Sequence, residues 1–294
     1  MVKGIISGIK RMEIHDGEGL RTTVFMKGCP LKCIWCHNPE SFSYRAEIGK
    51  FSEKCINCGN CVKVCPTGAT FWDNGYVLLD KTKCNACFKC ETACPVSAIV
   101  AYGQEYTVDG LLEEILEDKP FFGRMGGVTF SGGECLTQED FVIECAKKLK
   151  ENGVGVYIDT CGYIEREVLE KIIPYVDKFL YDIKAIDAEA HKRLTGKDNK
   201  RILDNLIYLA DKDCKVEIRY PLVKGCNDGE CEKIGEFLRS LGADYPIKVL
   251  RYHDFARSRY AALQKEDTLP KTTTSDVDID EARKILRGFG IETI

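Results

Sequence analysis

The sequence lacks several features that would place the protein in a membrane, outside the cell or on nucleic acid. No apolar run among the 294 residues reaches the roughly 20 residues of a membrane span. The segment from Met1 to Met12 alternates Gly, Lys and Ile and lacks the apolar core of a signal peptide. Neither a basic run nor a basic C-terminal tail occurs, and the net charge is −4. Nucleic acid and a membrane are therefore not expected as partners.

What the sequence has in excess is cysteine, with 17 residues. A secreted disulfide scaffold would be short, would carry a signal peptide and would have an even cysteine count. The cysteines instead cluster at gaps of two and three residues, which suits thiolates that converge on one metal centre. We therefore expect a reducing cytoplasmic location, in an anaerobic setting because air oxidises exposed clusters.

An internal repeat marks an inserted module. The spacing C-x₂-C-x₂-C-x₃-C-P occurs twice, with an offset of 29 residues. In two-cluster ferredoxins the fourth cysteine of each run serves the other cluster. We expect a ferredoxin-like module at 51–102. Its clusters would relay electrons, stabilise the fold of the insert, or do both. One [4Fe–4S] cluster would be held by Cys55, Cys58, Cys61 and Cys94, and the other by Cys84, Cys87, Cys90 and Cys65.

Outside the module, strand-like and helix-like segments alternate. Strands are expected at 22–27, 127–131, 154–159, 179–184, 216–221 and 247–250. Helices are expected at 107–118, 165–173, 202–211, 230–241 and 280–289. A further helix is expected to be capped by Thr137 and to end at Gly153. Residues 264–278 are expected to form a polar loop.

This alternation predicts an α/β fold with a parallel sheet, which would be doubly wound or a partial barrel. The polar motifs fall at the C-terminal ends of strands, where (β/α) barrels carry their active sites. We therefore expect a partial (β/α)₆ barrel formed by 1–50 and 103–294, with the module inserted between them.

The chemistry is expected to centre on Cys29, Cys33 and Cys36, a C-x₃-C-x₂-C run directly after the first strand. Three thiolates can hold three irons of a [4Fe–4S] cluster and leave the fourth iron open to bind a substrate. Trp35 would offer a flat apolar surface beside that iron. The alternative is zinc, which usually takes four ligands at paired C-x₂-C spacings. His37 is adjacent to Cys36, so both side chains would reach one tetrahedral ion only awkwardly.

A turn after the next strand contains Gly132, Gly133 and Glu134. The glycines would let the backbone approach a ligand closely, and Glu134 can accept hydrogen bonds from an ammonium group. The alternative interpretation is a plain tight turn.

Charged residues at later strand ends would complete the site. Asp182 and Lys184 are two residues apart, so they share a face if both lie on a strand. Asp159 and Asp182 bring negative charge that needs a cation, or they belong to a structural ion pair. Arg219 would make a bidentate contact with a carboxylate. His253 is a further candidate site residue, and the alternative is that it has only a structural role.

These motifs resemble those of the radical S-adenosylmethionine (SAM) superfamily, and within it the glycyl-radical enzyme activating enzymes, the family of the pyruvate formate-lyase activating enzyme. Residues 15–25, HDGEGLRTTVF, resemble the family's His-Asp-Gly-Pro-Gly-Ile-Arg-Thr stretch, and residues 35–40, WCHNPE, resemble its Trp-Cys-x-Asn-Pro-Glu. Later motifs match in order, so the resemblance covers nearly the whole chain and fits the type with a two-cluster insert. Glu18 and Cys135 stand where the family usually has Pro.

The resemblance implies that SAM binds the open iron and is cleaved to methionine and a 5′-deoxyadenosyl radical. That radical would abstract a hydrogen from a backbone glycine of a partner glycyl-radical enzyme. The implied electron donor is a flavodoxin or ferredoxin, and the protein would be monomeric.

The resemblance also implies roles for individual residues. The Gly132–Glu134 turn would hold the methionine amino group, and His253 would lie near the adenosine. Asp16 and the glycines at 17 and 19 would lie where the partner's glycine loop enters. A monovalent cation beside SAM would be held by Asp159, Thr160, the Leu180 carbonyl and Asp182, with Lys184 nearby.

Two other functions stay open at this stage. A radical SAM enzyme acting on a small molecule would share the same radical step. A low-potential electron carrier would explain the repeat but not the C-x₃-C-x₂-C run. The sequence does not indicate which glycyl-radical enzyme is the partner. It also assigns no role to Cys135, Cys161, Cys214, Cys226 and Cys231, whereas Cys145 is expected in the core.

Overall fold

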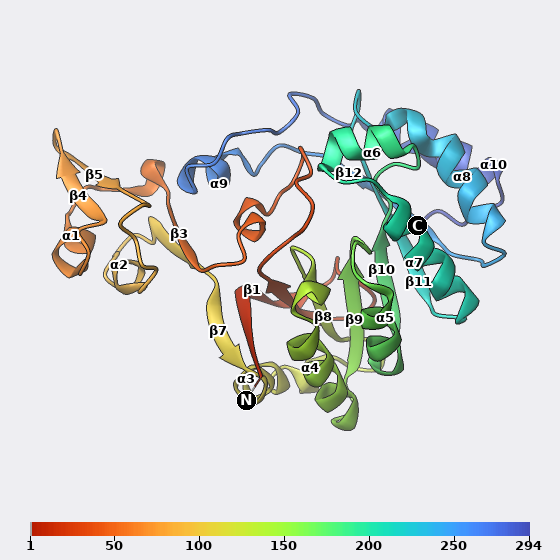
Figure 1. The fold of residues 1–294 in the computed structure, drawn as a ribbon, viewed down its shortest axis with the longest axis horizontal. Helices are drawn as coiled ribbons and strands as arrows, with labels where there is room; N and C mark the ends of the chain where they lie inside the picture. Colours follow the sequence, from red (N-terminus) through yellow and green to blue (C-terminus); the bar gives the residue numbers. More distant parts are fainter. Residues whose placement is uncertain (1) are drawn as a thin grey trace.

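The computed structural model describes residues 2–294, which are organised around one eight-stranded sheet in the order β12-β11-β10-β9-β8-β2-β1-β7 (Figure 1). Six of these strands run parallel, and the antiparallel β1 and β7 extend the sheet beyond β2. The parallel strands are β2 (Arg21–Met26), β8 (Gly127–Gly132), β9 (Gly155–Thr160), β10 (Lys178–Asp182), β11 (Val216–Leu222) and β12 (Ile247–Arg251). All six were expected from the sequence, and each observed end lies within two residues of its expected position.

The main helices also follow the expected order. They are α3 (Val108–Leu116), α4 (Glu139–Glu151), α5 (Arg166–Ile172), α7 (Lys200–Asp211), α8 (Cys231–Ser240) and α10 (Asp276–Gly288). As the helical spacing predicted, α4 buries Phe141, Cys145 and Leu149. The main core lies between the sheet and these helices.

Two helix starts differ from expectation. Thr137 does not cap α4, because it lies in a 3-10 turn, η4 (Cys135–Gln138), and its hydroxyl donates to the Glu134 carbonyl. α10 begins four residues before its expected start, because Ser275 and Asp278 form a capping box there. The expected polar loop is correspondingly shorter.

Outside the small unit described below, four strands and helices were not expected from the sequence: β1 (Lys3–Glu13), β7 (Gln104–Thr107), α6 (Ala188–Thr195) and α9 (Arg257–Ala262). β7 and α9 are shorter than the windows in which a hydrophobic period can be read. The remaining short 3-10 turns are η1 (Pro39–Phe42), η2 (Ser52–Lys54), η3 (Lys119–Phe121), η5 (Ile173–Tyr175) and η6 (Asp228–Glu230).

A small unit between β2 and β8 lies to one side of the main sheet (Figure 1). It contains two antiparallel strand pairs, β3 (Glu47–Lys50) with β6 (Ile99–Tyr102) and β4 (Thr70–Asp73) with β5 (Tyr76–Leu79). Two short helices, α1 (Asn60–Val64) and α2 (Lys89–Thr92), complete it. It has an apolar cluster of its own, which includes Ile48, Val77 and Ile99. In the part of the chain from residue 2 onward, no helix is both long and apolar enough to cross a membrane.

Candidate active site

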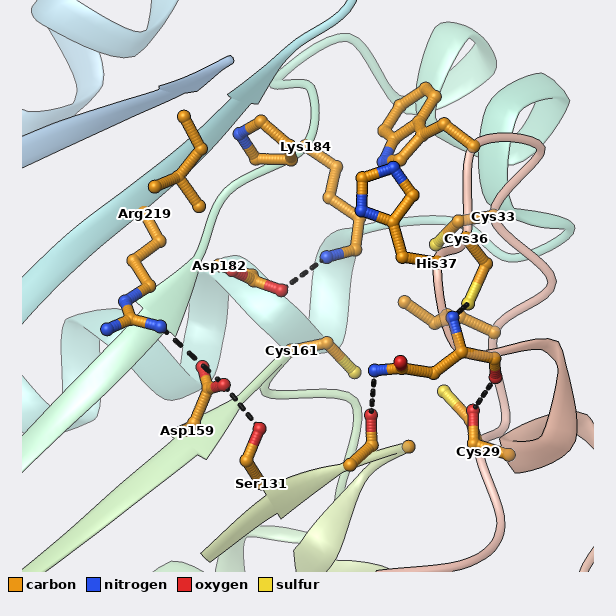
Figure 2. A pocket seen from close by; sticks show the side chains of 18 of the residues that line it. Cys29, Cys33, Cys36, His37, Ser131, Asp159, Cys161, Asp182, Lys184 and Arg219 are labelled. Atoms are coloured by element: carbon orange, nitrogen blue, oxygen red, sulfur yellow. Dashed lines mark hydrogen bonds and ion pairs between the residues drawn. The ribbon is translucent and has the colours of Figure 1, made fainter. Parts of the chain in front are cut away.

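A cavity of about 630 Å³ opens where the parallel strands end. The loop after β2 supplies one wall, and β9, β10, β11 and β12 supply the other (Figure 2). Most of the residues that the sequence singled out line this cavity: Cys29, Trp35, Gly132, Gly133, Asp159, Thr160, Asp182, Lys184, Arg219 and His253, together with Cys33 and Cys36. The structure therefore brings together residues from six different strands or strand ends.

The cysteine loop is held in place by the C-terminal end of α6. The backbone N–H groups of Lys32 and Ile34 donate to the carbonyls of Thr195 and Leu194, at 2.7 and 3.0 Å. Carbonyls in the last turn of a helix have no partner within the helix, so they are free to accept these bonds.

The other side of the same loop is held by α9. Arg259 donates from Nη1 to the His37 carbonyl at 2.9 Å, to Asn38 Oδ1 at 3.0 Å and to Glu40 Oε1 at 3.1 Å. Tyr260 donates its hydroxyl to the Cys36 carbonyl at 3.1 Å. Two helices that the sequence did not predict thus fix the backbone that carries the three thiols.

The buried environment of the three thiols fits an iron–sulfur cluster. Burial raises the pKa of Cys33 to about 12 and also raises the pKa of Cys36. Thiols that ionise with such difficulty become thiolates when a metal supplies positive charge. Within residues 2–294, no group of three or more His, Cys, Asp or Glu side chains is arranged around a single metal ion, as a zinc site would require. Thiolates of a cubane cluster bind separate irons and need not converge on one point.

The glycines of the turn after β8 allow the backbone to pack closely. Gly132 has a φ of +110°, and a Cβ on it would overlap the backbone of Met26. A Cβ on Gly133 would overlap the Gly28 carbonyl, which accepts a hydrogen bond from the Glu134 N–H at 2.8 Å. The turn is thereby fixed against the start of the cysteine loop.

The Glu134 side chain does not face the cavity as the sequence suggested. It is fully buried, and its carboxylate accepts the Thr160 hydroxyl at 2.8 Å and the Cys161 N–H at 2.8 Å. Burial raises the pKa of Glu134, against the effect of these hydrogen bonds. The carboxylate therefore connects the turn after β8 to the end of β9 through hydrogen bonds. An ammonium group in the cavity would instead have to donate to backbone carbonyls of the turn.

Asp182 and Lys184 lie on one side of the cavity and contact each other. Lys184 is 7% exposed, and its Nζ donates to Asp182 Oδ2 at 2.6 Å (Figure 2). Burial opposes ionisation of this lysine, but Asp182 and Cys33 raise its pKa overall. A buried cation therefore faces the thiols.

Asp159 and Arg219 lie beside this pair, on β9 and β11, the two strands that flank β10. Ser131 donates to Asp159 Oδ2 at 2.6 Å, and Arg219 Nη1 lies 3.7 Å from the same oxygen. Burial, together with the nearby Asp182, raises the pKa of Asp159 to about 7, although Arg219 opposes the shift. Arg219 lies inside β11, whose residues through Leu222 pair with β12.

The floor of the cavity is formed by the loop between β1 and β2. Arg219 donates to the His15 carbonyl at 3.0 Å and lies 3.6 Å from Asp16 Oδ1, while Thr23 donates to Asp16 Oδ2 at 2.9 Å. Gly17 and Gly19 were expected at the entrance for a partner loop. The structure places them below the floor instead, where they pack against the Tyr157 ring and the Gly126 backbone with positive φ angles.

His253 belongs to a stack of rings at the cavity wall. Its ring centroid lies 4.1 Å from that of His37, with an interplanar angle of 15°, and 4.4 Å from that of Phe255. His37 Nε2 also contacts the His253 carbonyl at 2.6 Å. The sequence considered His37 only as a zinc ligand, so this pairing was missed.

The small unit contains two further cysteine-lined cavities. One is lined by Cys55, Cys58, Cys61 and Cys94, and the other by Cys65, Cys84, Cys87 and Cys90. The repeat therefore folds so that each fourth cysteine lies beside the three cysteines of the other run.

One cysteine that lines the cavity received no role from the sequence. Cys161 lines the cavity together with Cys29, and its neighbouring thiol lowers the pKa of Cys29. Its position directly after Asp159 and Thr160 at the end of β9 was a signal that could have placed it there.

Comparisons with known proteins agree with this site. The model of the radical SAM superfamily matches residues 82–238, a 4Fe–4S dicluster domain matches 54–98, and a 4Fe–4S single cluster domain matches 15–58. In structure, Streptococcus suis SuiB bound to precursor peptide SuiA is similar over 91% of this chain and 46% of SuiB. The TM-score is 0.54 at 11% identity, which supports the fold alone.

Curated relatives are similar over nearly the full length. The choline trimethylamine-lyase activating enzyme of Oleidesulfovibrio alaskensis is 38% identical over 98% of this chain and 96% of its own. The trans-4-hydroxy-L-proline dehydratase activating enzyme of Clostridioides difficile is 39% identical over 89% of this chain and 88% of its own. The benzylsuccinate synthase activating enzyme of Thauera aromatica is 36% identical over 96% of this chain and 87% of its own. With its thiol-lined cavity and these relatives, the chain belongs to the glycyl-radical enzyme activating enzymes of the radical SAM superfamily.

Proposed function

We propose that this protein generates a glycyl radical in a partner glycyl-radical enzyme. The observation that carries the proposal is the single cavity that joins Cys29, Cys33 and Cys36 to Lys184 and Arg219. When bound by the three thiolates, a [4Fe–4S] cluster supplies the electron that cleaves SAM to methionine and a 5′-deoxyadenosyl radical. The chain's own residues bind, orient and shield the reactants.

The two buried cations are placed to receive the SAM carboxylate. Lys184 and Arg219 are 7% and 6% exposed, so a contact with either is little screened by water. The methionine amino group would bind the backbone of the Gly132–Gly133 turn, and the adenosine would lie against the rings of Trp35 and His253. Together these contacts would hold SAM with its sulfonium toward the thiols.

A monovalent cation beside Asp159 and Asp182 is part of this proposal. Burial raises the pKa of Asp159 and the nearby Asp182 adds to the shift, although Arg219 opposes it, so a bound cation would favour the ionised carboxylate. Thr160 and the Leu180 carbonyl, on β9 and β10, would complete its oxygen ligands. Such an ion would keep Asp159 ionised when the SAM carboxylate draws Arg219 and Lys184 away.

The floor of the cavity would contact the partner. Asp16 lines the cavity, and its carboxylate is 19% exposed. It can accept a hydrogen bond from a backbone N–H of an extended glycine loop. Selectivity requires that one C–H bond be held near the 5′ carbon while others are excluded. A partial (β/α)₆ barrel, open beside the C-terminal end of β12, would admit such a loop.

The inserted module would carry two more [4Fe–4S] clusters in its two cysteine-lined cavities. We expect about twelve irons per chain after reconstitution. A flavodoxin or ferredoxin would deliver electrons to this module in the cytoplasm, and the activase would act as a monomer. Replacing Cys29, Cys33 and Cys36 together with Ala should remove about four irons and abolish SAM cleavage.

The test uses a glycyl-radical enzyme encoded beside this gene. The reduced holoenzyme, SAM and that partner should together give the doublet electron-spin signal of a glycyl radical. A partner whose radical glycine is changed to Ala is the control and should give no doublet. If no neighbouring partner gives the doublet while a small molecule is consumed in step with 5′-deoxyadenosine release, the activase proposal is wrong and small-molecule radical chemistry replaces it.

A further inference from the structure

The hairpin of β4 and β5 in the inserted unit exposes apolar side chains that the proposed function does not use. Phe71, Trp72, Tyr76 and Leu78 are all exposed, and Tyr76 and Trp72 keep 63% and 51% of their surface in contact with water. Single exposed apolar residues are ordinary, but a group of them on one small element marks a surface for a partner. We call these four residues the hairpin surface.

The pairing of the two strands shows that folding does not account for this exposure. Thr70 pairs with Leu79, and both are buried, so they lie on the inner face of the hairpin. Phe71 pairs with Leu78 on the opposite, outer face, which Tyr76 shares because it is two residues from Leu78. The solvated face of a strand pair is ordinarily polar. The outer face of this hairpin is apolar instead.

Trp72 connects the hairpin surface to one of the cysteine-lined cavities. A Cβ on Gly59 would lie 2.7 Å from the Trp72 ring, so the indole packs directly over that glycine. Gly59 lines the cavity that contains Cys55 and Cys58, and Cys58 itself is exposed. A cluster in this cavity would therefore lie close behind the hairpin surface and close to solvent.

The other cysteine-lined cavity lies on the side of the unit that faces the barrel. Figure 1 shows α2, which carries Cys90, nearer to the main sheet than α1, which carries Cys61. Lys81, between the two cysteine runs, donates to the Leu263 carbonyl at the end of α9 at 2.6 Å. Tyr260 of α9 in turn donates to the loop that carries the three active-site thiols. An electron that enters at the hairpin would thus pass the two cavities in order on its way to the active site.

We propose that the hairpin surface docks a flavodoxin-type electron carrier, so that electrons enter the protein at the cluster held by Cys55, Cys58, Cys61 and Cys94. The inference rests on the proposed function, because it requires that cluster. One electron passes from the fully reduced flavin to the oxidised cluster. The flavin is oxidised by one electron, the cluster is reduced by one, and no bond is made or broken.

The chemistry of the hairpin surface favours a flavin over other occupants. The dimethylbenzene edge of a flavin is flat and apolar, so it loses little when it leaves water to contact aromatic rings. A ferredoxin would present a charged cluster, which an apolar surface matches poorly. Electron-transfer complexes need only small interfaces in which a few aromatic residues dominate. Four side chains are too few for a stable dimer of this chain, which would bury about 800 Å² on each copy.

The experiment follows reduction of the clusters in reconstituted holoenzyme, without SAM and without a glycyl-radical partner. Reduced flavodoxin is mixed anaerobically with the wild type or with Phe71→Thr, Tyr76→Thr or Phe121→Thr, and loss of the clusters' visible absorption gives the rate. Threonine keeps the preference for a strand at the two hairpin positions. Phe121 is exposed on η3, outside the inserted unit, so its variant controls for loss of an exposed aromatic ring. Dithionite replaces flavodoxin in a parallel series.

Phe71→Thr and Tyr76→Thr should keep the wild-type iron content. Each should raise the flavodoxin concentration that gives half the maximal rate about tenfold, as loss of an aromatic anchor does. Phe121→Thr should leave that concentration unchanged, and dithionite should reduce all four proteins at one rate. An unchanged flavodoxin dependence in both hairpin variants would overturn the proposal. Equal slowing with dithionite would overturn it too, because the hairpin would then only support the clusters.

Other occupants of the hairpin surface would give different results, and each result would also overturn the proposal. A ferredoxin is the occupant if it reduces the wild type, but not Tyr76→Thr, while flavodoxin reduces neither. A second copy of the chain is the occupant if the wild type is a dimer that Tyr76→Thr dissociates.

Failure of the proposed function is a separate outcome. The cluster held by the C-x₃-C-x₂-C loop should be SAM-sensitive, which means that its electron-spin signal changes when SAM binds the open iron. If dithionite-reduced wild type contains no SAM-sensitive cluster, the proposed function fails, whereas reduction of the inserted unit by flavodoxin still tests the docking surface.

Discussion

Lys184 is a buried ammonium that sits between a carboxylate and the thiols. With Asp182 at 2.6 Å as its hydrogen-bond partner, it can accept a second anionic partner without leaving its position. We predict that Lys184→Ala weakens SAM binding about ten- to hundredfold, because a charge-assisted hydrogen bond contributes about 1.5–3 kcal/mol. Equilibrium binding of SAM to the reconstituted protein measures this.

Lys248 supplies a matched control, because it is a second lysine that lines the same cavity, from β12. Lys248→Ala should change SAM affinity much less, since β12 is separated from the strand of Asp182 by β11. Equal losses in the two variants would show that the general positive charge of the cavity, and not the position of Lys184, binds the cofactor.

Asp159 gives the site a predicted pH dependence. Burial raises its pKa to about 7, far above the ordinary value of an aspartate, so the side chain is mostly protonated at pH 6 and mostly ionised at pH 8. A monovalent cation requires the ionised form. Its apparent affinity should therefore rise about tenfold as pH increases from 6 to 8 and should level off above that range.

The potassium dependence of SAM affinity, measured at both pH values, tests this prediction. Asp159→Asn should bind the cation weakly at either pH, with no rise between them. Asp109→Asn, which changes an exposed carboxylate on α3, should behave as the wild type. A potassium effect of equal size at pH 6 and pH 8 in the wild type would contradict the assignment of the cation to Asp159.

At the scale of single residues, the sequence predicted which residues gather in the cavity better than it predicted what they contact. Asp182 and Lys184 meet because residues two apart share one side of an extended chain. The Glu134 carboxylate turned away because the end of β9 presents a hydroxyl and an N–H to it. Spacing along one strand cannot show such contacts, which depend on how neighbouring strand ends pack.

At the scale of elements, the parallel strands were predictable and the helices that hold the cysteine loop were not. Each parallel strand carries a short apolar run, which is readable from the sequence. α6 and α9 are short, and α9 has only six residues. Their positions are set by tertiary contacts with the loop, through α6 carbonyls and the Arg259 guanidinium.

Arg259 offers a test of what α9 contributes. It binds three acceptors on the cysteine loop, so Arg259→Ala should loosen that loop. The side chain is 37% exposed, so we expect a modest loss, about 1 kcal/mol. That would appear as a several-fold faster release of iron from the SAM-sensitive cluster to a chelator.

Arg257→Ala is the control from the same helix, because Arg257 pairs with Asp254 and Asp267 and leaves the cysteine loop untouched. It should release iron at the wild-type rate. If both variants lose iron equally fast, α9 acts through overall stability and not through its contacts with the loop.

At the scale of the whole molecule, one carboxylate joins three parts of the chain. Glu47, at the start of β3, lies 3.0 Å from Lys27 Nζ at the end of β2 and 2.9 Å from Lys265 Nζ after α9. Lys81 Nζ, within the inserted unit, lies 3.3 Å from its other oxygen. Although burial opposes ionisation, Lys265 and Lys27 lower the pKa of Glu47, so it is charged at neutral pH. The repeat predicted that a unit was inserted here, but no sequence pattern indicated the residue that anchors it.

Lys27 makes this anchor energetically important. It is fully buried, and besides Glu47 its ammonium donates to the Glu40 carbonyl. Glu47→Gln would leave a buried cation without its counter-charge, which typically costs about 3–5 kcal/mol. We predict a marked loss of stability in anaerobic unfolding of the holoenzyme, together with faster proteolysis at the two junctions of the inserted unit.

Glu105→Gln is the control, because it breaks an exposed pair with Lys3 and should cost less than about 1 kcal/mol. If the two variants unfolded alike, the lysines around Glu47 would be solvated well enough without it, and the inserted unit would be held by its apolar contacts instead.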